Sequence, residues 1–228
     1  MSRLSHSLIA AAVLALSASA HAVPLNNAFG AQPFLDTSLP GTTSAARPEL
    51  AGTVLADELQ AFSFGALNIS GTVQNRVVRE DVSGTLDFYW RITVDPKSTG
   101  GGIGAFRLAQ FGYTDITDAD WRIDGSGLNG PDTARLFNPA SHPDGAINFL
   151  FDAPVRAGDD GSKFFFLHTN ATNYAKTALY DLLGGPNQTL SDSFATFAPS
   201  AVPEPSSYAM MGLGLAAVGG MVRRRRRD

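Results

Sequence analysis

The sequence predicts an all-β protein, an antiparallel β-sandwich of jelly-roll-like form, with a signal peptide before it and a single transmembrane helix after it. Residues 85–94 alternate strictly between apolar and polar side chains, which is the period of a strand with two different faces. Further short apolar runs follow, and clusters of Gly, Pro, Asn and Asp separate them at the spacing of strands and turns. The chain has no cysteine, so packing rather than disulfide bonds must hold this fold together.

Residues 1–22 have the three parts of a secretory signal peptide. Arg3 supplies the positive start, residues 8–16 form the apolar stretch, and Ala20 and Ala22 are the small residues of an A-x-A cleavage site. We therefore expect the secretion machinery to export the chain and signal peptidase to cleave it after Ala22.

Residues 23–201 are predicted to form the exported domain, and they are numerous enough to bury one sizeable core. Residues 23–48 contain several Pro, Asn and Gly residues and no sustained period, so we expect an irregular arm that packs across a sheet edge. The second half of residues 50–64 is predicted to be the first strand.

Residues 71–94 predict a β-hairpin whose turn lies at residues 81–84. The apolar members of its second strand are expected to face the core: Leu86, Phe88, Trp90, Ile92 and Val94. The residues between them are expected to face water: Thr85, Asp87, Tyr89, Arg91 and Thr93. One face of the hairpin should therefore lie in the core and the other in solvent.

The remaining strands are expected where short apolar runs recur between turn residues, at 104–113, 134–137, 147–151, 163–168, 174–183 and 193–197. Residues 98–104 are rich in Gly but lack the Gly-Lys-Ser/Thr of a phosphate-binding loop, so they are predicted to be a turn. The apolar residues of 174–183 fit the helical period as well as a period of two, so a helix is the alternative to the favoured strand.

Residues 202–228 consist of a short motif, an apolar segment and a basic terminus. The motif is Val202, Pro203, Glu204 and Pro205. Residues 206–222 carry no charge, and as a helix they would span about 25 Å, a little less than the hydrocarbon core of a bilayer. The arginines that follow form a positive-inside signal: Arg223, Arg224, Arg225, Arg226 and Arg227. We therefore predict a transmembrane helix at 206–222 with its basic tail in the cytoplasm.

These three parts, in this order, resemble the PEP-CTERM sorting signal of Gram-negative bacteria. The resemblance implies that exosortase, a membrane-embedded cysteine transpeptidase or protease, processes the chain near the Pro-Glu-Pro motif at 203–205. It also implies an inner-membrane intermediate and a final place at the cell surface or in the extracellular matrix, because the family is associated with exopolysaccharide and biofilm. The plainer alternative is a permanent membrane anchor in which the motif is only a linker.

The exported part of the chain is acidic. Without Arg3, the five terminal arginines, Glu204 and Asp228, it keeps 11 of the 17 Lys and Arg residues and 19 of the 21 Asp and Glu residues, a net charge of −8. Such a body repels phosphate backbones, so nucleic acid is not an expected partner.

No local pattern in the exported part predicts catalysis, and we expect a protein that is not an enzyme. His142 and His168 are its two histidines, and both are expected to have structural or solvent roles. No cofactor is expected, with calcium as the one candidate. Carboxylates in one acidic stretch could supply oxygen ligands to Ca²⁺, although a solvated loop is the simpler interpretation: Asp115, Asp118, Asp120 and Asp124.

Tyr89 and Trp121 are the candidates for an exposed aromatic surface that binds a sugar, because Tyr89 has polar neighbours and Trp121 lies in the acidic stretch. The sequence thus predicts an exported, non-enzymatic surface or matrix protein that exosortase processes. A carbohydrate-binding or calcium-dependent adhesion module is the alternative.

Overall fold

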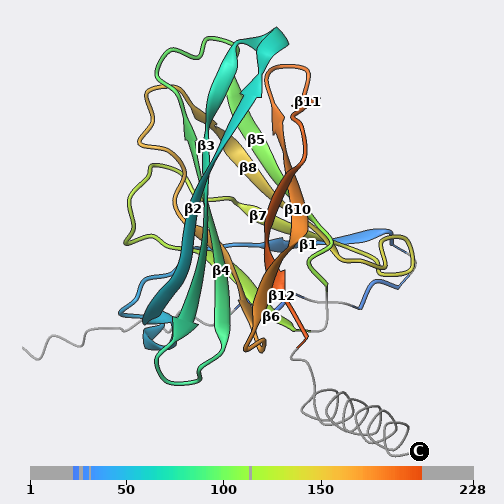
Figure 1. Ribbon diagram of the computed structural model, residues 1–228. Coiled ribbons are helices and arrows are strands. Elements are labelled where there is room, and N and C mark those ends of the chain that lie inside the picture. Colours follow the sequence, from blue (N-terminus) through green and yellow to red (C-terminus); the bar gives the residue numbers. More distant parts are fainter. Residues whose placement is uncertain (1–22, 26–27, 31, 113–114, 202–228) are drawn as a thin grey trace, which may run out of the picture.

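The structure, a computed structural model, describes residues 23–25, 28–30, 32–112 and 115–201. Two antiparallel sheets pack face to face over these residues, which confirms the predicted all-β sandwich (Figure 1). The predicted signal peptide and the predicted transmembrane helix lie outside the described residues. Among the residues that are described, no helix is both long enough and apolar enough to span a membrane.

The first sheet, called sheet A, contains the strands in the order β2 (Gly52–Phe64), β3 (Ile69–Glu80), β4 (Leu86–Val94), β9 (Phe165–Thr169) and β6 (Ile116–Trp121). The second, called sheet B, has the order β1 (Phe34–Ser38), β7 (Thr133–Phe137), β8 (Ala146–Arg156), β5 (Gly102–Ala109), β10 (Tyr174–Gly184) and β11 (Thr189–Leu190). The last strand, β12 (Phe194–Pro199), also pairs with β10. Two short 3₁₀ helices, η1 (Pro48–Leu50) and η2 (Gly65–Leu67), flank β2.

The chain changes sheet repeatedly, after β1, β4, β5, β6, β8 and β9. Consecutive strands stay together in the β2–β3–β4 meander, whose long β2 and β3 run the height of the molecule on one side of Figure 1. Because half of the paired strands are distant in the sequence, long-range packing between the sheets has to select this arrangement.

The core between the sheets is built around Trp90 of β4. Its side chain is 1% exposed, as predicted, and its ring centroid lies 5.4 Å from that of Phe106 on sheet B. Phe149 of sheet B and Phe165 of sheet A lie at 6.2 and 6.1 Å from the same ring. Tilted aromatic pairs at this spacing add to the stabilisation from buried area, so this cluster joins the two sheets.

A chain of hydrogen bonds crosses the same core. The indole Nε1 of Trp90 donates to Thr196 Oγ1 at 2.9 Å, and Thr196 donates in turn to Asn75 Oδ1 at 2.9 Å. Thr196 belongs to β12 of sheet B, whereas Asn75 lies beside Trp90 in sheet A. The polar atom of the central Trp is therefore satisfied by a bond that itself connects the sheets.

The predicted hairpin is present as β3 and β4, but its second strand does not have a face in water along its whole length. Asp87 and Tyr89 were predicted to be exposed, and they are 0% and 4% exposed. Leu50 of η1 and Phe166 of β9 pack with Tyr89 in a second apolar cluster on the outer face of sheet A. This half of the prediction was wrong because a distant segment covers the polar face.

The arm at residues 23–48 lines the edges of both sheets. On the edge strand β6, the backbone N–H of Ala119 donates to the carbonyl of Val23 at 3.2 Å, and the carbonyl of Trp121 accepts from the N–H of Thr42 at 2.8 Å. The arm is not wholly irregular, since Phe34–Ser38 form β1 against β7. The local sequence did not predict β1, because this strand forms only by pairing with β7, about a hundred residues further along the chain.

In three other segments the structure can be compared with the prediction from the sequence. Residues 52–64 form β2 over their full length, not only over the second half. The acidic stretch that was expected to be a loop contains strand β6. Residues 174–184 form strand β10, which is hydrogen-bonded to β5 on one side and β12 on the other, so the favoured strand is confirmed over the helix.

The backbone at Gly130 packs closely on the ring of Trp121, and a substitution at Gly130 tests this contact. A Cβ atom at Gly130 would lie 2.1 Å from the indole ring, and its φ is not in the left-handed region. Gly130→Ala should therefore lower the free energy of unfolding by about 1–3 kcal/mol, as overpacking of a filled site does. Chemical denaturation measures this change. Gly104→Ala is the matched control, since no described atom lies within 4 Å of its added Cβ, and an equal loss in both variants would contradict the prediction.

Candidate functional site

Part of the predicted set of functional residues cannot be placed. The cleavage residues Ala20 and Ala22, the motif at 202–205 and the arginines at 223–227 lie outside the described residues. The structure does place the two predicted sets in the body, the acidic residues and the aromatic residues.

Asp118 is not a free carboxylate. Its two oxygens accept hydrogen bonds from the guanidinium of Arg47 at 2.8 and 3.2 Å, and both side chains are 3% exposed. Arg47 also pairs with Glu49 at 2.8 Å and lies over the ring of Phe166, 5.7 Å from its centroid. Burial opposes the charge on Arg47, but hydrogen bonds with Asp118 and Glu49 raise its pKa above the usual range. The pair fastens the arm onto the outer face of sheet A.

The other acidic residues have different partners. Asp120 Oδ1 accepts from the backbone N–H groups of Gly41 and Trp121 at 2.8 and 2.9 Å. Its Oδ2 is buried without a hydrogen bond from any described residue, and burial raises the pKa of this carboxyl. Asp124 binds Arg122 at 2.9 Å, which lowers its pKa, and also accepts from Ser44.

The structure therefore does not gather the predicted calcium ligands around one point. Asp118 and Asp120 project from β6 toward different partners, Asp124 lies in the turn after the strand, and Asp115 lies before it. Local spacing suggested a shared loop, whereas strand β6 separates these side chains.

The two predicted sugar-binding aromatics do not present open ring faces. Tyr89 packs against Phe166 at 5.0 Å between ring centroids. The ring of Trp121 lies against Gly41 and Gly130, and its Nε1 donates to the carbonyl of Leu39 at 3.2 Å. Tyr89 does contribute to the wall of a hollow of about 370 Å³ on the outer face of sheet A.

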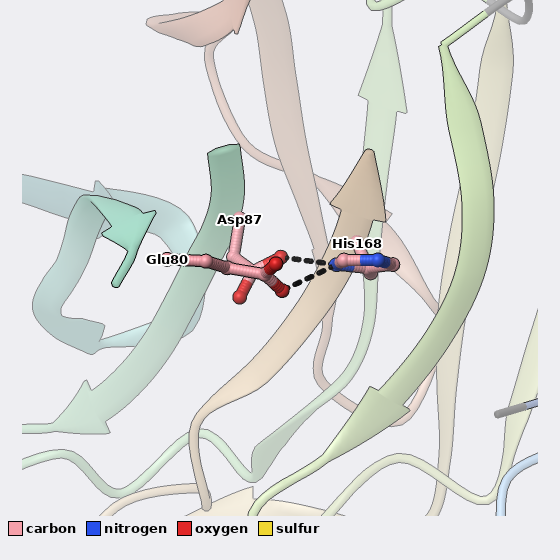
Figure 2. A group of neighbouring side chains, drawn as sticks. All are labelled: Glu80, Asp87 and His168. Atoms are coloured by element: carbon pink, nitrogen blue, oxygen red, sulfur yellow. Dashed lines mark hydrogen bonds and ion pairs between the residues drawn. The ribbon is translucent and has the colours of Figure 1, made fainter. Parts of the chain in front are cut away.

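A cluster that the sequence did not predict lies beside this hollow, at one end of β3, β4 and β9. Figure 2 shows the carboxylates of Glu80 and Asp87 pointing at the imidazole of His168. His168 Nδ1 is 2.6 Å from Asp87 Oδ1 and 3.1 Å from Glu80 Oε1. Asp87 and His168 are direct cross-strand partners, and Glu80 ends β3 just before the hairpin turn.

The cluster is largely withdrawn from water. The side chains of Glu80, Asp87 and His168 are 2%, 0% and 17% exposed. Glu80 Oε2 accepts hydrogen bonds from the hydroxyls of Ser83 and Thr85 in the turn. Glu80 Oε1 is buried and has no hydrogen bond from any described residue.

Burial and charge perturb both titratable partners of the closest contact. Burial raises the pKa of Asp87 to about 6, although the hydrogen bond with His168 acts in the opposite direction. Burial lowers the pKa of His168, but the hydrogen bond with Asp87 and the charges of Asp87 and Asp118 outweigh it and raise the pKa. Such a site can retain a proton or hold a cation, because its carboxylates lack enough positive partners.

The sequence offered little signal for this cluster. Asp87 was assigned to a solvent-facing row, and His168 was expected to have a structural or solvent role. Glu80 and Asp87 are close in the chain only across a hairpin turn, and His168 follows 81 residues after Asp87.

Comparison with known proteins concerns the other end of the chain. The family model for the PEP-CTERM protein-sorting motif matches residues 201–227. Neither the curated proteins nor the solved structures contain a match to the chain.

Removing Arg47 should be strongly destabilising. Arg47→Ala leaves Asp118 as a buried carboxylate without its cation, which costs about 3–5 kcal/mol of folding free energy. Arg135→Ala is the matched control, because its pair with Asp36 has side chains that are 30% and 43% exposed. That control should lose about 1 kcal/mol or less. Denaturant titration of both variants measures the difference, and similar losses would contradict the assigned role of the buried pair.

Asp120 should make the protein less stable as the pH rises. Because its pKa is raised in the folded state, folding favours the protonated form, so stability is lost between the unfolded-state pKa of about 3.9 and the higher folded-state value. Asp120→Asn keeps the Oδ1 acceptor and removes the buried charge. We expect this variant to have a higher Tm than the wild type at pH 7, with an advantage that shrinks toward pH 3. A lower Tm at pH 7 would show that the charge of Asp120 is favourable.

Proposed function

The chain carries a PEP-CTERM protein-sorting motif at residues 201–227, and on this premise we propose that it is a non-enzymatic protein of the cell surface or extracellular matrix. The motif implies an exported protein that passes the membrane and has exosortase as its processing partner. In this proposal the tail is the sorting signal, and the β-sandwich is the domain that is exported. The observation that carries the proposal is the motif match at the end of the chain.

The contacts of the buried charged residues fit a structural role for the β-sandwich domain. Arg47 and Asp118 join the arm to sheet A, and the contact between Asp87 and His168 joins two strands of that sheet. These groups make their closest contacts with one another, as expected of residues that hold segments together. Such a body can persist outside the cell without disulfide bonds, since the chain has no cysteine.

The destination in an exopolysaccharide or biofilm matrix rests on the association of the sorting signal with such matrices and on the charge of the body. A net charge of −8 keeps the exported domain hydrated and soluble. It also suits a matrix rich in mobile cations. Binding of purified matrix polysaccharide by the domain would instead favour the carbohydrate-binding alternative.

Processing is tested by the intact mass and the C-terminal peptide of the protein recovered from its host. We expect a form that ends near residues 202–205, and we expect this form to be absent from a strain without the exosortase gene. A mature protein that keeps Arg223–Arg227 in both strains would make the tail a permanent anchor and would overturn the proposal.

The motif itself can be tested in the same host. Replacing Pro203, Glu204 and Pro205 by Ala should abolish the processed form while the full-length form accumulates in the inner membrane. Ser206→Ala with Ser207→Ala is the control, because it changes neighbouring residues and leaves the Pro-Glu-Pro motif intact. Processing that is lost equally in both variants would mean that the motif has no specific role.

A further inference from the structure

We propose that Glu80, Asp87 and His168 bind one divalent transition-metal ion, with Zn²⁺ as the best fit, and that this ion links β3, β4 and β9. The inference concerns the stability of the exported domain and does not depend on how the tail is processed. It assigns a ligand to the one group of three or more metal-ligating side chains that converges within the described residues.

The geometry brings one donor atom from each residue to a common point. One donor atom of each residue lies within 4.8 Å of the donor atoms of the other two. The contacts of Asp87 Oδ1 and Glu80 Oε1 with His168 Nδ1 measure 2.6 and 3.1 Å. Bond lengths of about 2.0–2.2 Å place the ligand atoms of a tetrahedral zinc site roughly 3.3 Å apart. An ion could therefore enter with side-chain movements of less than about 1 Å.

The charge around this point calls for a cation. Glu80, Asp87 and Asp118 place three carboxylates in the buried region, and Arg47 is bound to Asp118. Even a protonated imidazole supplies only one positive charge for the two carboxylates of Glu80 and Asp87. Since buried charges are costly unless they are paired, a dication would offset both at once.

The second carboxylate oxygen of Glu80 supports the same conclusion. Glu80 Oε1 is buried, has no hydrogen bond within the described residues and lies 3.1 Å from the imidazole nitrogen. Ser83 and Thr85 hold the other oxygen and so fix the orientation of the carboxylate. Outer hydrogen bonds of this kind orient the ligands in metal sites. The carboxylate of Glu80 is thus held in a fixed orientation with Oε1 directed at the imidazole, as a metal ligand requires before the ion arrives.

The donor set selects the class of ion. Imidazole suits Zn²⁺ and its first-row neighbours, and carboxylates bind them as well. Ca²⁺ takes six to eight oxygen ligands, which two carboxylates and one imidazole do not supply. The proposed ligands and ion therefore differ from the calcium site expected at Asp115, Asp118, Asp120 and Asp124, although Asp118 pairs with His168 across β6 and β9.

An ion at this point would act as a crosslink. Glu80 closes β3, Asp87 lies at the start of β4 and His168 lies on β9, so three strands of sheet A would share one bound ion. Binding that occurs only in the folded state stabilises that state. In an exported chain without cysteine, this would do for sheet A what a disulfide does elsewhere.

The test is a Zn²⁺ titration of the full-length chain, purified in mild detergent and stripped with a chelator. Calorimetry should give one Zn²⁺ per chain, and Tm should rise by about 5 °C or more at a hundredfold excess over Kd. Ca²⁺ at the same concentration should leave Tm nearly unchanged. No Zn²⁺-dependent rise in Tm would overturn the proposal and leave the cluster as a hydrogen-bonded ion pair.

Matched variants locate the ion. His168→Gln and Glu80→Gln should abolish the Zn²⁺-dependent rise, whereas His142→Gln, which changes the other histidine of the body, should keep it. A rise that survives His168→Gln, or that is lost with His142→Gln, would show adventitious binding elsewhere. Elemental analysis of wild-type protein purified without chelator is independent of whether a variant folds. It should find about one equivalent of metal, and a value near zero would count against the site.

Discussion

The packing of Trp90 between the two sheets is the constraint on which the rest of the fold depends. Its ring contacts aromatic rings from both sheets, and its indole N–H starts the hydrogen-bond chain through Thr196 to Asn75. Apolar contact alone would let the sheets slide, because it has no direction. The directional bonds through Thr196 favour one alignment of β12 over β3 and β4.

The outward residues of β4 then meet the arm. Arg47 reaches sheet A from the arm and pairs with Asp118, while Leu50 packs on Tyr89. This cover removes water from the outer face of the sheet at the same end where Glu80, Asp87 and His168 converge. Burial also explains the raised pKa of Asp87.

The sorting motif and the β-sandwich domain have different tasks. The sorting motif at residues 201–227 implies an exported protein that exosortase processes. The body has to remain folded after export without disulfide bonds, and it uses a large aromatic core, a buried ion pair and the carboxylate–imidazole cluster on sheet A.

The sequence by itself determined the features that depend on nearby residues: the β class, the hairpin, the inward position of Trp90 and the sorting motif. Periodicity and motif spacing are local, so a single sequence reveals them. The burial of Tyr89 and Asp87, strand β1 and the meeting of Glu80 with His168 were decided only by the tertiary structure. Each of them requires a segment some tens of residues away to arrive at one place, and no local pattern records which segment that will be.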